Sequence, residues 1–406
     1  AARDAIYPQF ATHNAHSLAA IFHLAAADGR AWQPGDYEFQ CLHGMGEPLY
    51  DQLVGQPGRH RMVRIYAPVG SHETLLAYLV RRLLENGANT SFVNRIVDER
   101  VAVEELIADP VEQAAALAGA PHPRIPLPCD LFGALRTNSA GIDLASEPVR
   151  ARIAAAIEAS RSMPFAAGPI VAGSVAVPAE VQPVTNPANH SETVGGVAEA
   201  TAADIERALA AASAAAPDWA AQPAAMRCTR LQTAAELFER DADTLIALAV
   251  REAGKSWANA VAELREAVDF LRYYAQQARG FDAASHVPLG PVLCISPWNF
   301  PLAIFVGQIA AALAAGNTVV AKPAEQTPLI AAQAIQLLHQ AGVPADALCF
   351  LPGDGRIGAA LVADRRCAGV AFTGSTEVAR LIAQSLADKP GPIVPLIAET
   401  GGQNAL

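Results

Sequence analysis

Residues 287–322 read VPLGPVLCISPWNFPLAIFVGQIAAALAAGNTVVAK, and no charged side chain occurs in this stretch before Lys322. A membrane-spanning helix needs about 20 consecutive apolar residues, so the length of the run alone would permit one. Prolines at 291, 297 and 301 and the Gly316-Asn317 pair interrupt the run, however, and such residues mark loops and turns. We therefore expect strand, loop, helix, turn and strand, buried in a parallel sheet whose strands are continuous apolar runs.

The same alternation extends along the chain on the C-terminal side of this run. Strands are expected at 292–296, 318–322, 347–351, 369–373 and 393–398. Helices are expected between them at 301–315, 329–341, 356–363 and 376–387, and before them at 202–215, 224–254 and 256–279. This order is typical of a doubly wound, Rossmann-like nucleotide-binding domain.

The first hundred residues also alternate between strand and helix. Strands are expected at 7–12, 37–42 and 63–67, and helices at 17–27 and 72–86. Three such units indicate a parallel sheet, but a closed barrel of this type needs eight. Residues 100–180 are rich in proline and contain one expected helix, at 150–160, so we interpret them as a connecting arm.

The composition excludes several classes of protein. The chain has 406 residues, of which 52% are hydrophobic and 17% charged, and this excludes a disordered chain. The net charge is −11 and no long basic run occurs, so we expect no nucleic-acid partner for this segment. Six cysteines without a C-x-x-C pair indicate reduced thiols in a cytoplasmic protein. Neither end resembles a natural terminus, and we expect the chain to be a piece of a longer protein.

The helix expected at 72–86 carries a charged face. Tyr78, Arg81, Arg82 and Glu85 lie at i, i+3, i+4 and i+7, so they share one side of the helix. Two arginines can clamp a carboxylate, Glu85 can hold an arginine in place, and Tyr78 and Tyr66 can flank an apolar ring. The spacing alone favours the simpler alternative, a solvated face with i,i+4 ion pairs.

Three histidines near the first expected strand raise the question of a metal. His13, His16 and His23 have suitable spacing, but no carboxylate or cysteine nearby completes a site, so we expect no metal. We interpret Thr12-His13-Asn14 instead as a polar cluster at the end of a strand that hydrogen bonds a ligand.

Four stretches in this first part resemble the proline dehydrogenase family. They are YPQFATHN at 7–14, FQCLHG at 39–44, YAPVG at 66–70 and YLVRRLLEN at 78–86. The resemblance covers about residues 5–100 and implies the last units of an FAD-containing (β/α)8 barrel that oxidises L-proline. It implies that Arg81 and Arg82 bind the proline carboxylate and that the tyrosines and Leu42 pack against the ring. It also implies that the Thr12–Asn14 segment contacts FAD.

The expected nucleotide-binding domain carries four motifs, each at the carboxyl end of a strand. They are SPWNFP at 296–301, KPAEQTP at 322–328, FTGST at 372–376 and ETGG at 399–402. Open α/β sheets bind ligands at this edge. Ordinary turns would explain the prolines and glycines, but not the gathering of Asn299, Lys322, Glu325 and Glu399 at one rim. The pattern Gly353-x-Gly355-x-x-Gly358 is weak evidence alone, and we interpret it mainly as a turn.

Together these motifs resemble the aldehyde dehydrogenase superfamily, over about residues 180–406. The resemblance implies that Asn299 stabilises an oxyanion and that Glu399 is the general base. It implies that Lys322 and Glu325 bind ribose hydroxyls, which favours NAD over NADP because a carboxylate repels a 2′-phosphate. The remaining NAD-binding residues that it implies are Ser296, Pro297, Trp298, Gly374 and Ser375.

The catalytic cysteine of this family follows the Glu-x-Gly-Gly motif by some thirty residues, whereas this chain ends seven residues after Glu399. None of the six cysteines matches its position, and Cys294, Cys349 and Cys367 are expected to be small buried residues. We therefore expect the 406-residue chain alone to catalyse neither proline oxidation nor aldehyde oxidation.

The order of the two resemblances indicates three parts: 1–100 from a barrel, 101–180 as arm and 181–406 as nucleotide-binding domain. The whole resembles bifunctional bacterial enzymes, which oxidise proline to pyrroline-5-carboxylate with FAD and then glutamate semialdehyde to glutamate with NAD. The resemblance implies a membrane quinone as electron acceptor, cytoplasmic location with peripheral membrane contact, and a homo-oligomer. Two alternatives remain: a single-activity aldehyde dehydrogenase with a degenerate barrel as a binding module, and a non-catalytic scaffold.

Overall fold

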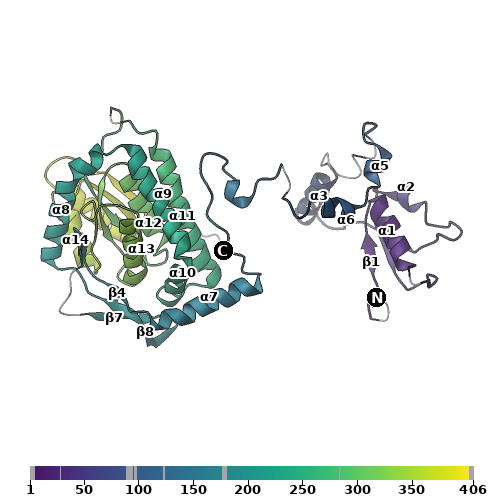
Figure 1. Cartoon of the computed structure of the whole chain (residues 1–406), viewed down its shortest axis with the longest axis horizontal. Helices are drawn as coiled ribbons and strands as arrows, with labels where there is room; N and C mark the ends of the chain where they lie inside the picture. The colour runs from purple at the N-terminus through teal and green to yellow at the C-terminus, as the bar shows by residue number, and fades with distance from the viewer. Residues whose placement is uncertain are drawn as a thin grey trace. The chain divides into compact units, whose positions relative to one another are not determined.

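The computed structural model describes residues 5–27, 29–87, 95, 98–121, 124–175, 181–282 and 284–401, without the side chains of 85–87 and 175. The chain divides into two compact units, Ala1–Pro121 and His122–Leu406. Figure 1 shows the elements of each.

The first unit contains a parallel sheet in the order β1-β2-β3, formed by Gln9–Ala11, Glu38–Leu42 and Val63–Tyr66. The longer helices are α1 (Ala15–Ala25) and α3 (His72–Gly87), and the shorter ones are α2 (Glu47–Tyr50), α5 (Val103–Leu106) and α6 (Pro110–Ala116). Phe39 and Cys41 are fully buried in its core, where Tyr37 and Tyr50 surround Phe39. The three expected strand–helix units are therefore present.

A buried carboxylate lies at the start of β2. Glu38 forms an ion pair with Arg64 at 2.8 Å and accepts hydrogen bonds from Tyr7, Gln9 and Gln40. The Arg64 hydrogen bond is the main reason why the pKa of Glu38 falls to about 2, against the effect of burial. This cluster cross-links the three strands at the edge opposite the candidate site, and nothing in the sequence indicated it.

The large sheet of the second unit has the order β13-β12-β9-β10-β11-β5-β6. Five strands are parallel: β9 (Pro291–Ile295), β10 (Thr318–Lys322), β11 (Leu348–Phe350), β12 (Gly369–Gly374) and β13 (Leu396–Thr400). If these five strands are numbered 1 to 5 along the chain, their order across the sheet is 5-4-1-2-3. Read from the other edge this is 3-2-1-4-5, the strand order of a doubly wound fold. The short strands β5 (Ile170–Val171) and β6 (Ser174–Val175) add an antiparallel edge. The predicted Rossmann-like domain is therefore confirmed.

Helices cover the two faces of this sheet (Figure 1). Their buried side chains form two hydrophobic clusters. One cluster contains α9 (Ala224–Arg240), α10 (Ala242–Arg251), α11 (Trp257–Ala278), α12 (Ala303–Ala314) and α13 (Pro328–Gln340). The other contains α8 (Ala202–Ala221), α14 (Gly355–Ala363) and α15 (Thr376–Ala387). The single helix expected at 224–254 is wrong, because the chain turns at Asp241 and forms α9 and α10. Helix α8 is longer than expected and continues past Pro217 to Ala221.

The apolar run that opened the sequence analysis forms β9, a loop, α12, a turn and β10, as predicted. In the turn, Gly316 has a φ of +90°, and the Asn317 side chain accepts hydrogen bonds from the amides of Leu289 and Gly290. No helix within the described residues has both the length and the hydropathy needed to cross a bilayer.

Residues 128–162 are part of the second unit. They form η1 (Pro128–Asp130), α7 (Glu147–Ala159) and η2 (Ser160–Ser162), and α7 contacts α10 through the fully buried Ile153. The amide and hydroxyl of Ser139 both donate to the carboxylate of Asp269 on α11, at 2.9 and 2.7 Å. A further sheet follows, in which β8 (Asn189–Val197) lies between β4 (Phe165–Ala167) and β7 (Gln182–Asn186). Much of the expected arm thus belongs to the core of the second unit.

Candidate active sites

In the first unit, the candidate residues gather at the carboxyl ends of the three strands. Leu42 pairs with Tyr66 at the ends of β2 and β3, and the Leu42 amide donates to Nε2 of His13 at 3.3 Å. The hydroxyl of Tyr50 donates to the carbonyl oxygens of Thr12 and Gln40, and burial raises the pKa of Tyr50 to about 12. The segment after β1 is thereby fixed against β2.

The Thr12–Asn14 segment forms the start of α1. Asn14 caps the helix by accepting hydrogen bonds from the amides of His16 and Ser17, and the Thr12 hydroxyl accepts one from the Asn14 amide. Burial, and then the charge of Arg82, lower the pKa of His13. Because Nε2 of this neutral ring accepts a hydrogen bond, Nδ1 carries the proton and can donate to a ligand.

Helix α3 brings Tyr78 and Arg82 to this edge. The guanidinium of Arg82 lies 5.2 Å from the centre of the Tyr78 ring. Burial, and then a hydrogen bond with Tyr78, raise the pKa of Tyr66, and the charge of Arg82 acts in the opposite direction. Arg81 is exposed in the same turn. The side chain of Glu85 lies outside the described residues, so its expected contact with an arginine remains a prediction.

In the second unit, the register of the strands places all four motif loops at one edge. Ile295 pairs with both Lys322 and Phe372, and Thr373 pairs with Glu399. The strand order reverses between β9 and β12, where open α/β sheets bind ligands. The predicted rim is therefore confirmed as a feature of the fold.

Lys322 and Glu325 differ in their exposure at this rim. The Lys322 side chain is buried, and its ammonium group donates to the carbonyl oxygen of Pro323 at 2.8 Å. Burial lowers the pKa of Lys322, while the carboxylates of Glu325, Asp354 and Glu199 favour its charged form. The Glu325 carboxylate is exposed, where it can accept hydrogen bonds from a ligand.

The glycines of the Gly353-x-Gly355-x-x-Gly358 pattern have backbone roles, as expected. Gly353 has a φ of +154°, and a Cβ there would lie 2.6 Å from Cγ1 of Ile357. A Cβ at Gly358 would lie 3.5 Å from the Cδ of Lys322. Helix α14 therefore packs directly against the lysine stem, with Asp354 as its N-cap.

The other expected NAD-binding residues lie on the loops after β9 and β12. Ser375 is exposed and caps α15, because its hydroxyl accepts a hydrogen bond from the Val378 amide at 3.2 Å. A Cβ at Gly374 would lie 2.6 Å from the Phe372 ring. On the β9 loop, Ser296 is buried, Pro297 is half-buried and Trp298 is exposed.

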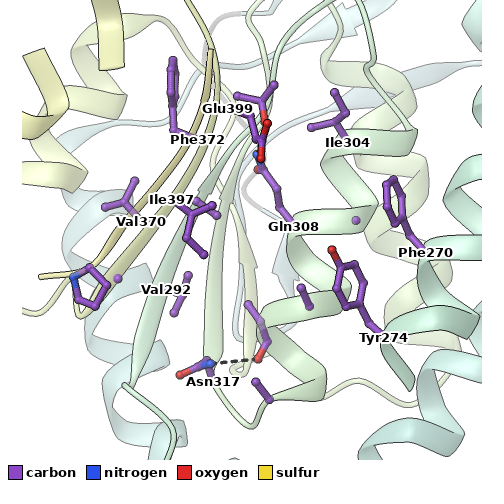
Figure 2. A pocket seen from close by; sticks show the side chains of 18 of the residues that line it. Phe270, Tyr274, Val292, Ile304, Gln308, Asn317, Val370, Phe372, Ile397 and Glu399 are labelled. Atoms are coloured by element: carbon purple, nitrogen blue, oxygen red, sulfur yellow. Dashed lines mark hydrogen bonds between the residues drawn. The ribbon is translucent and has the colours of Figure 1, made fainter. Parts of the chain in front are cut away.

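A cavity of about 650 Å³ lies between α11, α12 and the face of β12 and β13 (Figure 2). Glu399 lines it together with Gln308, while Phe270 and Tyr274 project into it from α11. Burial raises the pKa of Tyr274, and the charges of Tyr273 and Glu399 raise it further. The expected general base thus lies at the wall of a largely apolar cavity, next to the nucleotide rim.

Gln308 is a site residue that the sequence analysis missed. Its Nε2 donates to the carbonyl oxygen of Ile295 at 3.3 Å and to the hydroxyl of Thr373 at 3.0 Å. Its Oε1 is buried and has no hydrogen-bond partner among the described residues. The available signal was that Gln308 is the one polar side chain within the apolar helix at 303–314.

Five of the six cysteines are poorly suited to act as a nucleophile. All six are free, and five of them are buried. Burial raises the pKa of Cys294 and Cys367, and it raises the pKa of Cys349 to about 11. Thiols in such surroundings are poor sources of thiolate. Among the described residues, no three His, Cys, Asp or Glu side chains gather in a way that could hold a metal ion.

Comparison with known proteins gives two family matches and two groups of relatives. The bifunctional protein PutA of Klebsiella aerogenes is 58% identical over 99% of this chain and 31% of its own length. The 1-pyrroline-5-carboxylate dehydrogenase of Bacillus mycoides is 38% identical over 59% of this chain and 50% of its own length. The chain thus spans about a third of the length of the bifunctional relatives.

Solved structures agree with these relatives. A Bradyrhizobium japonicum proline utilization A variant covers 98% of this chain and 38% of its own chain, with a TM-score of 0.74 and 47% identity. A Thermus 1-pyrroline-5-carboxylate dehydrogenase with bound NAD covers 66% of this chain and 55% of its own, with a TM-score of 0.63 and 36% identity. Residues 1–95 match the proline dehydrogenase family. Residues 176–406, more than half of the sequence, match the aldehyde dehydrogenase family, and the chain belongs to that family.

Proposed function

We propose that this chain takes part in a two-step oxidation of L-proline to glutamate. Its first unit contributes to FAD-dependent formation of pyrroline-5-carboxylate, and its second unit to NAD-dependent oxidation of glutamate semialdehyde. The observation that supports the proposal is the edge of the second unit at which the parallel strands end, preceded in one chain by a proline dehydrogenase match. Lys322 and Glu399 lie near the ends of β10 and β13, and Asn299 and Glu325 lie on the loops at this edge. The bifunctional relatives support the same order of activities.

The second unit has suitable groups for NAD and for the aldehyde. Glu325 and Lys322 would hold the adenosine ribose, and Ser375 at the start of α15 favours a phosphate oxygen. NAD, when bound, accepts the electron pair that leaves the aldehyde carbon. Asn299 would donate its amide to the carbonyl oxygen as that oxygen becomes negative, and Glu399 would take up the proton.

The first unit has suitable groups for an amino-acid carboxylate. Arg81 and Arg82 supply positive charge, while Tyr66, Tyr78 and Leu42 supply flat and apolar surface for a ring. FAD, when bound, accepts the electron pair from proline. His13 can donate from Nδ1 toward that cofactor, whereas the hydrogen-bonding oxygens of Thr12 and Asn14 are engaged in beginning α1.

Oxidation of the aldehyde also needs a thiolate that adds to the carbonyl carbon. The buried cysteines with raised pKa do not suit this role, so we propose that the thiol comes from outside the described residues. We further propose that the chain alone catalyses neither reaction. Transfer of the flavin electrons to a membrane quinone, a cytoplasmic location at the membrane surface and a homo-oligomeric state are parts of the same proposal.

A full-length protein that carries these residues allows the two activities to be assayed separately. Arg82→Met should raise the KM for proline by roughly ten- to a hundredfold, because a charged hydrogen bond is worth about 1.5–3 kcal/mol. The same variant should oxidise glutamate semialdehyde normally. Glu399→Gln should instead lower the oxidation of glutamate semialdehyde and leave the KM for proline unchanged. A protein without flavin absorbance or proline-dependent dye reduction would instead support a single-activity aldehyde dehydrogenase. A protein that fails to bind NAD would support a scaffold.

A further inference from the structure

The loop that carries Asn299 is bounded by a buried carboxylate. Glu263 on α11 is 1% exposed, and its Oε2 accepts hydrogen bonds from the amides of Leu302 at 3.2 Å and Ala303 at 2.9 Å. These amides begin α12, directly after the loop. The other oxygen, Oε1, accepts a hydrogen bond from the ammonium group of Lys255 at 2.8 Å.

Lys255 contacts the same loop from the other side of Pro301. Its Nζ lies 4.3 Å from the centre of the Phe300 ring, which is within the range of a cation–π interaction. Phe300 is the residue immediately after Asn299. The Lys255–Glu263 pair therefore contacts the chain both before and after Pro301.

The Asn299 side chain itself is exposed, and it has no hydrogen-bond partner among the described residues. The backbone around Asn299 therefore determines where this side chain begins and which region its amide can reach. Pro297 and Pro301 restrict two positions of the loop. The residues between them depend on what holds Phe300 and the start of α12.

We propose that the Lys255–Glu263 ion pair positions the Asn299 amide for its oxyanion. The inference rests on the proposed function of Asn299. A donor of this kind is effective only where it is fixed before the reaction, and a displacement of about 1 Å can cost about a hundredfold in rate. Lys255 and Glu263 act through Phe300 and α12 and do not touch the substrate.

The test uses a full-length protein that carries these residues and measures aldehyde oxidation and NAD binding. Lys255→Met should lower kcat by roughly 10- to 100-fold, with the Kd for NAD changed less than about twofold. Lys255→Arg keeps the charge and should retain kcat within about threefold. Lys389→Met is the matched control and should leave kcat unchanged. Lys389 donates to the carbonyl oxygen of Cys367, and this is its one hydrogen bond among the residues that the structure describes.

A double-mutant cycle separates positioning from general support of the fold. Asn299→Ala should lower kcat by about 10²–10³-fold, and Lys255→Met should then add less than about threefold. Full additivity in that cycle would overturn the positioning role, as would an unchanged kcat in Lys255→Met. If Asn299→Ala alone leaves kcat unchanged, the proposed function of Asn299 is wrong, and the inference fails with it.

A second variant keeps the test decisive if Lys255→Met does not fold. Phe300→Leu removes the ring but leaves the ion pair, and it should lower kcat by a smaller factor, again only while Asn299 is present. An additive effect of Phe300→Leu in the Asn299→Ala background would overturn the proposal in the same way.

Discussion

At the N-termini of two helices on one face of the large sheet, the backbone amides donate hydrogen bonds to a buried glutamate. The two glutamates differ in whether a cation pairs with them. At α12, Glu263 accepts hydrogen bonds from two amides and also pairs with Lys255. At α13, Glu252 accepts hydrogen bonds from the amides of Leu329 and Ile330, at 2.6 and 2.8 Å, and no lysine or arginine within the described ranges pairs with it. Glu252 is only 3% exposed, and burial raises its pKa to about 8 despite these two bonds.

The comparison shows how far the backbone amides at a helix N-terminus can stabilise the charged form of a buried carboxylate. Two amide donors lower the pKa of Glu252, but they do not offset the loss of water. The α12 start has the additional positive charge of Lys255, and it carries the loop of Asn299. The α13 start has a proton that can leave near neutral pH, and it follows the loop of Glu325.

The largest expected effect comes from breaking the ion pair. Glu263→Gln leaves Lys255, which is 13% exposed, facing an amide instead of a carboxylate. Removing one partner of a buried pair costs about 3–5 kcal/mol, so the free energy of unfolding of the whole chain should fall by that amount. Urea unfolding followed by circular dichroism measures it.

The matched control is Glu206→Gln, which breaks the more exposed pair with Arg366 and should shift the urea midpoint far less. If the two variants shift the urea midpoint equally, burial does not explain why the ion pair at the start of α12 stabilises the chain.

The next effect distinguishes the α13 start by its pH dependence. Because the pKa of Glu252 is higher in the folded chain than in the unfolded one, the native state holds an extra proton between about pH 4.5 and 8. The stability that this proton contributes is therefore fully present below this window. The free energy of unfolding falls by at most about 1.4 kcal/mol per pH unit as pH rises through the window, and it levels off above pH 8.

Glu252→Gln removes this proton. The unfolding free energy of the wild type minus that of Glu252→Gln should therefore decrease as pH rises from 5 to 8, because only the wild type loses stability in this range. A difference that is constant over this range would show that Glu252 does not bind the extra proton.

A smaller effect should reach both helix starts at once. Gly254 lies between Glu252 and Lys255, has a φ of +66°, and a Cβ there would lie 3.0 Å from the Cγ of Pro187. Gly254→Ala should cost about 1–2 kcal/mol through backbone strain alone. It should also speed hydrogen exchange of the Ala303 and Ile330 amides together.

Gly391→Ala serves as its control. Gly391 also has a positive φ, of +119°, but a Cβ there meets nothing within 4 Å. The Gly391→Ala variant should leave the hydrogen exchange of the Ala303 and Ile330 amides unchanged. If Gly254→Ala alters only one of the two amides, the turn does not link the two helix starts.

The smallest expected effect concerns a cap at the surface. Thr201 begins α8 in a capping box, in which its hydroxyl accepts from the Asp204 amide and Asp204 accepts from the Thr201 amide. Thr201→Ala should cost about 1 kcal/mol, because water can replace the lost bond at this exposed residue. Thermal unfolding measures it, and a cost equal to that of Glu263→Gln would mean that burial does not distinguish the caps.

The strand positions and the rim were predictable because local patterns determine them. Apolar runs bounded by proline and glycine marked β9 and β10, and the order of strands and helices then placed Asn299 and Glu399 at one edge. The amides that donate to Glu252 and Glu263 were not predictable in this way. They lie 39 to 78 residues away, and no periodic pattern records which amide a distant carboxylate reaches.

The same distinction explains the other differences. The Ala-rich stretch at 224–254 has no strong breaker, so the turn at Asp241 was not evident, whereas packing of α10 against α7 requires it. Similarly, the prolines at 121–128 indicated an arm, but the burial of Ile153 depends on helices that come much later in the sequence.

The bond between Ser139 and Asp269 also has a consequence for synthesis of the protein, because the two residues are 130 positions apart. At about 5–20 residues per second, a ribosome would add Asp269 roughly 6–26 s after Ser139. Helix α7 contacts α10, which ends at Arg251, so its apolar side lacks this partner for most of that interval. We therefore expect Ile153 of the nascent chain to stay accessible to solvent until α10 has emerged from the ribosome.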